Sequence, residues 1–220
     1  MAKIATTKPA LIMLYGYPGS GKTYFARQFA EGVQAAHVQG DRIRAELFEQ
    51  PRYDKEENNV VNQLMMYMTE SFLEAGLSVV YDINSMRARQ RLELRELARR
   101  CHAVPVVVWF QVDLESSFAR SIKRDRRRAD DKYSPAMDRA TFDDLVGHMQ
   151  NPKPNEDFVV VSGKHTFNTQ FSALARRMRE LGMLGSGDAN SKAVKPGLVN
   201  LVPNPASGRV DMTRRNIVIR

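Results

Sequence analysis

The residues with the clearest chemical potential form a glycine-rich run near the start of the chain. In order, they are Gly16, Tyr17, Pro18, Gly19, Ser20, Gly21, Lys22 and Thr23. The run fits the pattern G-x-x-x-x-G-K-[ST], in which glycines let the backbone curl so that successive N–H groups point at phosphate oxygens. We expect Lys22 to reach the β- and γ-phosphates of a nucleotide and the Thr23 hydroxyl to bind Mg²⁺. The run therefore predicts a site for ATP and Mg²⁺.

The segments on both sides of this run are those that a phosphate-binding loop requires. Residues 10–15 are apolar throughout and predict a buried strand, and residues 21–31 have the period of an amphipathic helix. A strand, a glycine-rich loop and a helix in that order place the positive end of the helix dipole at the phosphates. An ordinary glycine-rich turn is the alternative, and this context argues against it.

Two aspartates are candidates for the metal and for acid–base chemistry. Asp82 ends the apolar run 77–82, the Walker B arrangement, and is expected to hold Mg²⁺ directly or through water. Asp41 follows a short expected strand at 37–40, and the carboxyl ends of strands line the ligand crevice of an open α/β sheet. Asp41 can therefore accept the proton of an attacking hydroxyl, a role compatible with capping the helix that it begins. Arg44, one helical turn further on, is placed to hold the acceptor.

A basic stretch supplies candidate cations for a lid over the nucleotide. Its basic residues are Arg120, Lys123, Arg124, Arg126, Arg127, Arg128 and Lys132. Phosphoryl transfer needs cations that neutralise charge on the γ-phosphate oxygens, and a mobile segment can bring them in while it excludes water. Arg120 and Arg124 share one helix face, so we choose Arg120 for nucleotide binding and Arg124 for catalysis. A solvated, charged helix end is the simpler alternative for the stretch.

Short apolar runs alternate with segments of helical period over most of the chain. Strands are expected at 10–15, 37–40, 77–82, 104–111 and 158–161. Helices are expected at 21–31, 41–49, 55–75, 87–101, 114–126, 140–150 and 168–181. Strands that are apolar throughout and separated by helices indicate a parallel sheet covered on both faces. The predicted class is a three-layer α/β fold.

Beyond residue 181 the chain is rich in glycine, serine, asparagine and proline and has little periodicity. We predict one P-loop domain at 1–181 and a flexible basic tail at 182–220. The net charge of +8 favours an acidic partner such as ATP, a phosphorylated metabolite or a nucleic acid. The single cysteine excludes an intrachain disulfide, and no apolar run reaches membrane-spanning length. We therefore expect a cytoplasmic protein with no membrane partner.

A second basic row has i, i+4 spacing on the helix expected at 87–101. It comprises Arg87, Arg91, Arg95 and Arg99. Because glutamates accompany the row, we expect a solvated helix face, and contact with a polynucleotide backbone is the less favoured alternative. The histidines are given no role because they lack metal-ligand spacing. They are His37, His102, His148 and His165.

At these elements the chain resembles a group of P-loop kinases with an AAA-type ATP-binding domain. The group includes polynucleotide 5′-hydroxyl kinases, zeta-toxin-type sugar-nucleotide kinases and small-metabolite or seryl-tRNA kinases. The resemblance spans about residues 10–181 and rests on four features. These are the glycine-rich run, Asp41 with Arg44, the strand ending in Asp82-Ile83-Asn84, and the lid arginines before Pro152.

The resemblance implies a role for several residues and an order for the strands. Asp41 would be the general base, Arg44 would help to bind the acceptor or its phosphate, and Arg124 would act from the lid. Asp82 and Asn84 would lie where metal, acceptor and base meet. The resemblance also implies the sheet order 2-3-1-4-5.

The predicted activity is transfer of the γ-phosphoryl group of ATP to a hydroxyl acceptor. The 5′ end of a nucleic acid, a nucleotide sugar and a small metabolite all remain open as acceptors. An ATP-driven switch or ATPase without an acceptor is the main alternative, but Asp82 is followed by Ile83 and not by a glutamate that would activate water. A GTPase is disfavoured because the guanine motif Asn-Lys-x-Asp does not occur. A non-catalytic nucleotide-binding module would be expected to lose Asp41 or Arg44.

Overall fold

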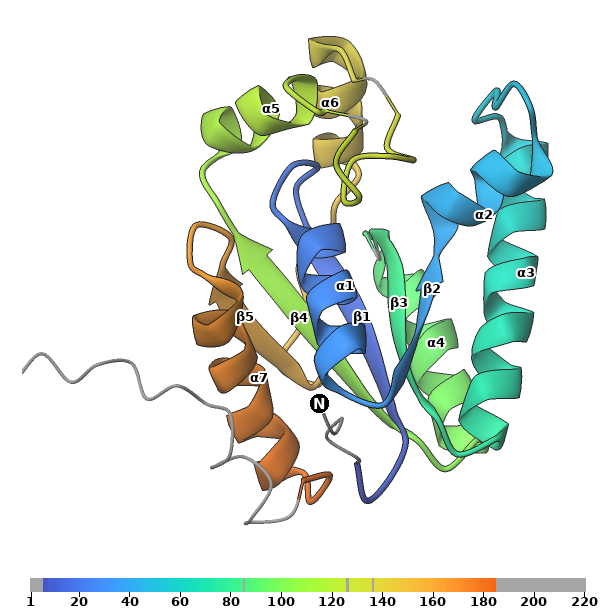
Figure 1. Ribbon diagram of the computed structural model, residues 1–220, viewed down its shortest axis with the longest axis vertical. Coiled ribbons are helices and arrows are strands. Elements are labelled where there is room, and N and C mark those ends of the chain that lie inside the picture. Colours follow the sequence, from blue (N-terminus) through green and yellow to red (C-terminus); the bar gives the residue numbers. More distant parts are fainter. Residues whose placement is uncertain (1–5, 85, 126, 136, 185–220) are drawn as a thin grey trace, which may run out of the picture.

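The computed structural model describes residues 6–84, 86–125, 127–135 and 137–184. These residues contain five strands, β1 (Ala10–Gly16), β2 (Ala35–Gln39), β3 (Ser78–Asn84), β4 (Val104–Gln111) and β5 (Phe158–Ser162). They form one parallel sheet in the order β2-β3-β1-β4-β5 (Figure 1). This confirms the predicted fold class and strand order.

Within the described residues, seven helices connect and cover the strands. They are α1 (Lys22–Gly32), α2 (Gly40–Leu47), α3 (Lys55–Glu74), α4 (Ala88–Arg100), α5 (Leu114–Ile122), α6 (Arg139–Gly147) and α7 (Phe167–Glu180). Each lies within a few residues of a helix expected from the sequence. The largest difference is α5, which ends at Ile122, whereas the expected helix continued to residue 126.

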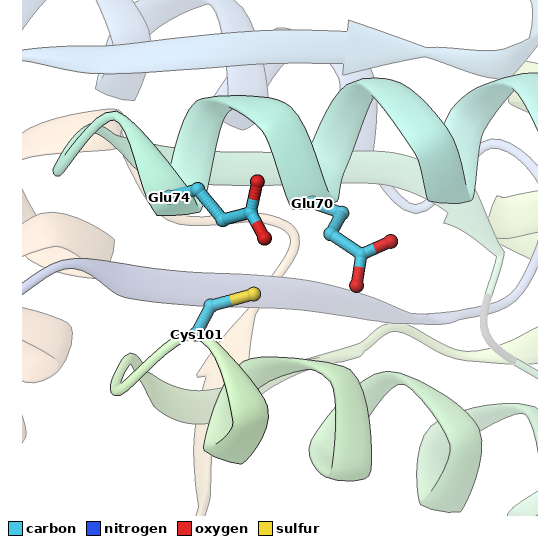
Figure 2. A group of neighbouring side chains, drawn as sticks. All are labelled: Glu70, Glu74 and Cys101. Carbon is cyan, nitrogen blue, oxygen red and sulfur yellow. The ribbon is translucent and has the colours of Figure 1, made fainter.

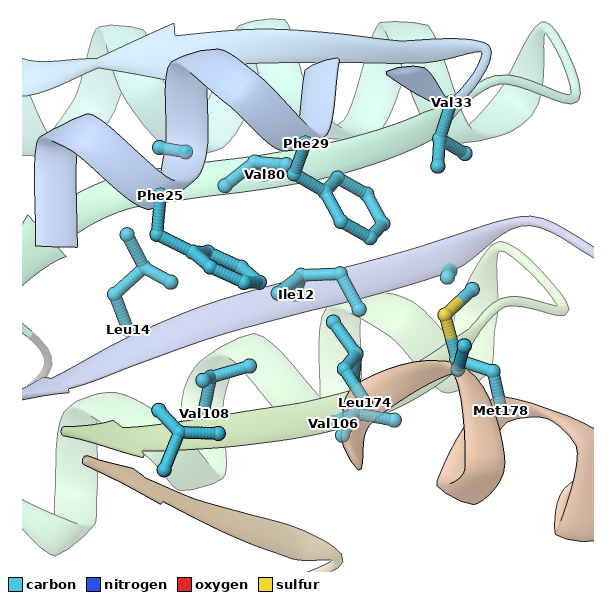
Figure 3. Close-up of a cluster of buried hydrophobic side chains, with 14 of the residues drawn as sticks. Ile12, Leu14, Phe25, Phe29, Val33, Val80, Val106, Val108, Leu174 and Met178 are labelled. Carbon is cyan, nitrogen blue, oxygen red and sulfur yellow. The ribbon is translucent and has the colours of Figure 1, made fainter. Parts of the chain in front are cut away.

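Two apolar cores lie on opposite faces of the sheet, because successive side chains of a strand point to opposite faces. On one face Ile12 and Leu14 pack with Phe25 and Phe29 of α1 and with Leu174 of α7 (Figure 3). On the other face, alternate residues of the same strands pack against α3 and α4. This second core contains Leu11, Met13, Val61, Met65, Leu73 and Leu94. A central strand buried on both faces explains why β1 is apolar at every position.

The basic row on α4 is not a uniformly solvated face, and this part of the prediction was wrong. Arg91 is fully buried, and its Nε and Nη2 donate to the Glu156 carboxylate at 2.7 and 3.0 Å. Its guanidinium also lies 5.2 Å from the centre of the Tyr15 ring. A charge can be buried in this way only when a partner and hydrogen bonds compensate for the lost water. Arg91 thus joins α4 to the segment that leads into β5.

The packed domain extends beyond residue 181. Met183 and Leu184 are buried in the α1–α7 core, and the Met183 carbonyl accepts from the Thr7 N–H at 2.9 Å. The domain boundary therefore lies at least three residues later than the sequence suggested. The rest of the expected tail, residues 185–220, lies outside the described residues. Among the helices that are described, none combines the length and apolar content needed to cross a membrane.

Candidate active site

The glycine-rich loop connects β1 to α1 at the carboxyl edge of the sheet. Gly19 and Gly21 have φ angles of +81° and +96°, the left-handed region that glycine adopts without strain. A Cβ atom on Gly19 would also lie 2.3 Å from the carbonyl oxygen of Ser117 in α5. The loop conformation therefore depends on glycine at this position. Because Gly21, the N-cap of α1, has no side chain, the first N–H groups of the helix stay available for an anion.

Lys22 lies inside the curl of this loop. Its Nζ donates to the carbonyl oxygens of Gly16 and Tyr17, both at 2.8 Å. Burial lowers the pKa of Lys22 to about 7, partly offset by the negative charge of Asp82. The bond from the Ser117 hydroxyl to the Pro18 carbonyl, at 3.0 Å, fixes the outer side of the loop to α5.

Asp82, at the end of β3, connects the loop with β2. One carboxylate oxygen of Asp82 accepts from the Thr23 hydroxyl at 3.3 Å, and the other lies 2.9 Å from His37 Nε2. The Thr23 hydroxyl and the Asp82 carboxylate are hard oxygen donors, the type that Mg²⁺ prefers. The donor set therefore fits the predicted metal.

Sequence reasoning gave His37 no role, although a usable signal was present. The parallel register places His37 beside Val80, so His37 and Asp82 lie on the same face of neighbouring strands, two positions apart. Metal-ligand spacing along the chain does not detect a contact between a histidine and a carboxylate across strands.

Asp41 lies in the first turn of α2, beside the residues just described. Its pKa is raised to about 6, first by burial and then by the charge of Asp82, while Arg124, Arg44 and Lys22 lower it in part. A carboxylate with this pKa is mostly ionised at neutral pH and still a useful proton acceptor. Asn84 also reaches this region, because its Oδ1 lies 3.4 Å from the Gly16 nitrogen.

Arg44 is held in place by residues of α3 and not only by its own helix. It is 4% exposed, and its guanidinium donates to Glu57 Oε2 at 2.9 Å and to Asn58 Oδ1 at 2.5 Å. The ring of Tyr53 covers the guanidinium at 4.7 Å, and Tyr53 has a φ of +59°, which is unusual for a bulky residue. Glu57, which the sequence did not single out, also accepts the N–H groups of Arg52 and Tyr53. It therefore fixes both Arg44 and the loop before α3.

The two chosen lid arginines reach the site from the segment that begins at α5. Arg124 donates to the Pro135 carbonyl at 3.2 Å, and the charge of Asp41 partly offsets the effect of burial, which lowers the Arg124 pKa. Arg120 donates to the Gly163 carbonyl at 2.9 Å and lies beside Gly19. Arg124 is therefore on the Asp41 side of the loop, whereas Arg120 is on the β5 side. Figure 1 shows α5 and α6 beyond the carboxyl ends of the central strands, as expected for a lid.

A separate group of potential metal ligands lies at the opposite ends of the strands from the glycine-rich loop. Glu70, Glu74 and Cys101 bring three ligand atoms within 4.8 Å of one another, at the C-terminal ends of α3 and α4 (Figure 2). Arg100 pairs with Glu70 at 3.4 Å, and burial together with both glutamates raises the pKa of the Cys101 thiol. Because these ends point away from the glycine-rich loop, the group takes no part in the site described above (Figure 1).

A parallel sheet of this order, a G-x-x-x-x-G-K-T loop and an aspartate at the end of the adjacent strand define a kinase-like P-loop nucleotide-binding domain. The chain belongs to the AAA domain family, whose model matches residues 11–152. It is 27% identical over 180 residues to a probable adenylyl-sulfate kinase of Pyrococcus abyssi, covering 79% of this chain and 97% of the relative.

Two solved structures show the same fold. A gluconokinase from Sinorhizobium meliloti 1021 has a TM-score of 0.57 at 17% identity, covering 79% of this chain and 96% of that chain. Kti12 from Chaetomium thermophilum, solved with ADP-AlF3, has a TM-score of 0.59 at 18% identity, covering 76% and 96%. At these identities the likeness concerns the fold alone. The glycine-rich loop on this fold indicates a nucleotide-binding site.

Proposed function

We propose that this protein is an ATP-dependent kinase that transfers the γ-phosphoryl group of ATP to a hydroxyl acceptor. The observation that carries the proposal is Asp41, a carboxylate with a pKa of about 6 that interacts electrostatically with Lys22, Asp82 and Arg124. A protein that only binds ATP has no use for a base beside two cations, whereas a kinase needs such a base to activate the hydroxyl of its acceptor. Asp41 lies close to the phosphate-binding loop, so it can activate an acceptor hydroxyl beside the γ-phosphate.

In the proposed reaction the P-loop N–H groups and Lys22 hold the β- and γ-phosphates, and Thr23 and Asp82 would hold Mg²⁺. The metal ion would supply positive charge at the β- and γ-phosphate oxygens. Asp41 takes the proton of the acceptor hydroxyl as that oxygen forms a bond to the γ-phosphorus. The bond between the γ-phosphorus and the β,γ-bridging oxygen breaks, and ADP leaves. Lys22 and Arg124 neutralise the negative charge that spreads over the transferred group.

The remaining residues position these groups. His37 fixes one oxygen of Asp82, which leaves the other directed at Thr23. Arg44 presents its charge to Asp41 from a fixed place because Glu57 and Asn58 hold its guanidinium. Arg44 is thus placed to bind the acceptor at a site that forms before the acceptor arrives. A preformed site reduces the entropy lost on binding.

The decisive experiment is a transfer screen with γ-labelled ATP and Mg²⁺. The acceptors are 5′-hydroxyl RNA and DNA, nucleotide sugars and a pool of hydroxylated metabolites. The enzymes are the wild type, Asp41→Asn, and the matched control Asp144→Asn, which changes an aspartate whose side chain is 70% exposed on α6. Label on one acceptor class, retained in the control and lost in Asp41→Asn, is the expected result. ATP hydrolysis with no labelled acceptor, equal in all three enzymes, would instead establish an ATPase.

A further inference from the structure

A cavity of about 640 Å³ opens at the carboxyl edge of β1, β4 and β5. Its lining includes Tyr15, Gly16 and Tyr17 at the start of the P-loop, with Trp109 and Gln111 of β4. Asn151 and Lys164 belong to the loops on either side of β5 and also line it. The lining contains neither Lys22 nor Asp41 nor Asp82. The cavity is thus next to the P-loop but separate from the catalytic cluster.

The inner part of the cavity is aromatic and rigid. The Trp109 ring packs edge-on against Tyr15, with ring centres 5.7 Å apart, and against Phe158 at 6.0 Å. The Tyr15 hydroxyl donates to Asn151 Oδ1 at 2.8 Å, which fixes the loop that forms one wall. Trp109 is only partly buried, so part of its indole is open to the cavity. Such a surface suits a planar ring.

The polar groups of the cavity are neutral or already paired. Its two charged side chains, Asp113 and Lys164, bind each other at 2.6 Å. In contrast, the side-chain amide of Gln111 and the indole N–H of Trp109 have no hydrogen-bond partner among the described residues, and the NH₂ of Asn151 likewise donates to none of them. The cavity therefore offers open hydrogen-bond donors and acceptors beside aromatic rings, and its two charges compensate each other.

We propose that this cavity binds a heteroaromatic ring of the nucleobase type. A base has two stackable faces, and its edge alternates donors and acceptors in one plane, which is the complement of a glutamine or asparagine amide. A phosphate or a metal ion does not fit, because the paired Asp113 and Lys164 leave no net charge for either. The base comes from a free nucleoside or from a nucleotide of a single strand, since both present the same faces and edge. This inference does not depend on the kinase proposal.

Trp109 is the only tryptophan of the chain, so its fluorescence reports on this cavity alone. The probes are adenosine, cytidine, a short single-stranded oligonucleotide and, as a neutral hydroxylated control, glucose. With excitation at the red edge of indole absorption, we expect saturable quenching by the nucleosides and none by glucose. A lower half-saturation concentration for the oligonucleotide than for its nucleoside would identify a strand as the source, and an equal or higher one would identify the free nucleoside.

Gln111→Leu is the discriminating variant, because it removes the amide and leaves a side chain of similar size at an exposed position. Nucleoside binding should weaken about three- to tenfold, the effect of one lost hydrogen bond. Labelled-ATP binding to the P-loop should not change in this variant, and Gln63→Leu, at another exposed glutamine, should behave as the wild type. Unaltered nucleoside quenching in Gln111→Leu would place the nucleoside elsewhere and overturn the proposal. Absence of quenching by every base, or quenching by glucose, would overturn it as well.

Discussion

The replacement Asp41→Asn should stabilise the folded protein while it lowers phosphoryl transfer by about a hundredfold or more. Folding raises the Asp41 pKa from 3.8 to about 6, chiefly because burial disfavours the charged carboxylate. At about 1.36 kcal/mol for each pKa unit, the ionised side chain costs the fold up to about 3 kcal/mol. Because the side chain is partly exposed, water reduces this cost, and we expect about 1–3 kcal/mol. An asparagine carries no charge and avoids the cost.

The sign of the effect determines its pH dependence. Below pH 3.8 the carboxyl is protonated in both the folded and the unfolded state, so wild type and Asp41→Asn should have similar stability. Between 3.8 and about 6 the unfolded state ionises first, and the advantage of the variant should grow. Above about 6 it should be constant. The melting temperature should then rise by about 2–4 °C for each kcal/mol gained.

Thermal unfolding of both proteins from acid to neutral pH, followed by circular dichroism, measures this directly. Transfer of γ-label at neutral pH gives the second readout, in which Asp41→Asn should lose about a hundredfold or more. Asp144→Asn should match the wild type in both assays, because that carboxylate is largely exposed. A variant that is inactive and also less stable than wild type at neutral pH would refute the reasoning, since it would mean that Asp41 is a structural residue.

Three other perturbations test the site and its supports. ATP affinity should fall as the pH rises through about 7, because Lys22 then loses its proton. Equilibrium dialysis with labelled ATP measures this, and a constant affinity across the range would contradict the lowered pKa of Lys22. Arg91→Met should lower the free energy of unfolding in urea by about 3–5 kcal/mol, because it leaves the buried Glu156 carboxylate without its partner. Adding Glu156→Gln should recover part of this loss. An equal loss in the single and the double variant would mean that the unpaired carboxylate is not the cause. Gly19→Ala should reduce both ATP affinity and stability, because its Cβ would lie 2.3 Å from a backbone oxygen. Gly32→Ala should reduce neither, because the space around Gly32 is open. Thermal unfolding and labelled-ATP binding compare the two variants, and equal effects in both would contradict the steric argument.

The parts of the fold that sequence predicted well are those set by local patterns. β1 and β4 are flanked by layers on both faces, and burial on both sides leaves a continuous apolar run in the sequence of each strand. The P-loop was equally clear, because its glycines answer a local conformational need at Gly19 and Gly21. The end of α5 was less predictable: the sequence from Lys123 on keeps its helical composition, yet the structure ends the helix at Ile122.

The parts that sequence missed depend on contacts between distant segments. Arg91 has the spacing of an exposed helix face, and only its pairing with Glu156, 65 residues away, explains its burial. Glu57 is one of two acidic residues in the first turn of α3, and only the structure shows that its carboxylate accepts from Arg44 and from two backbone N–H groups. A periodicity argument shows which face of a helix is polar. It does not show whether a partner segment covers that face.

The ways in which the site arginines are held suggest how the site works. Arg44 is bound to a carboxylate, a charge-assisted bond roughly twice as strong as one to a neutral group, so its position should persist when ligands arrive. Arg124 and Arg120 instead bind the backbone carbonyls of Pro135 and Gly163. A phosphate oxygen is a stronger acceptor than a carbonyl oxygen and can replace it. We infer that the acceptor half of the site is fixed in advance, whereas the lid arginines are free to exchange a neutral partner for the charged phosphates of ATP.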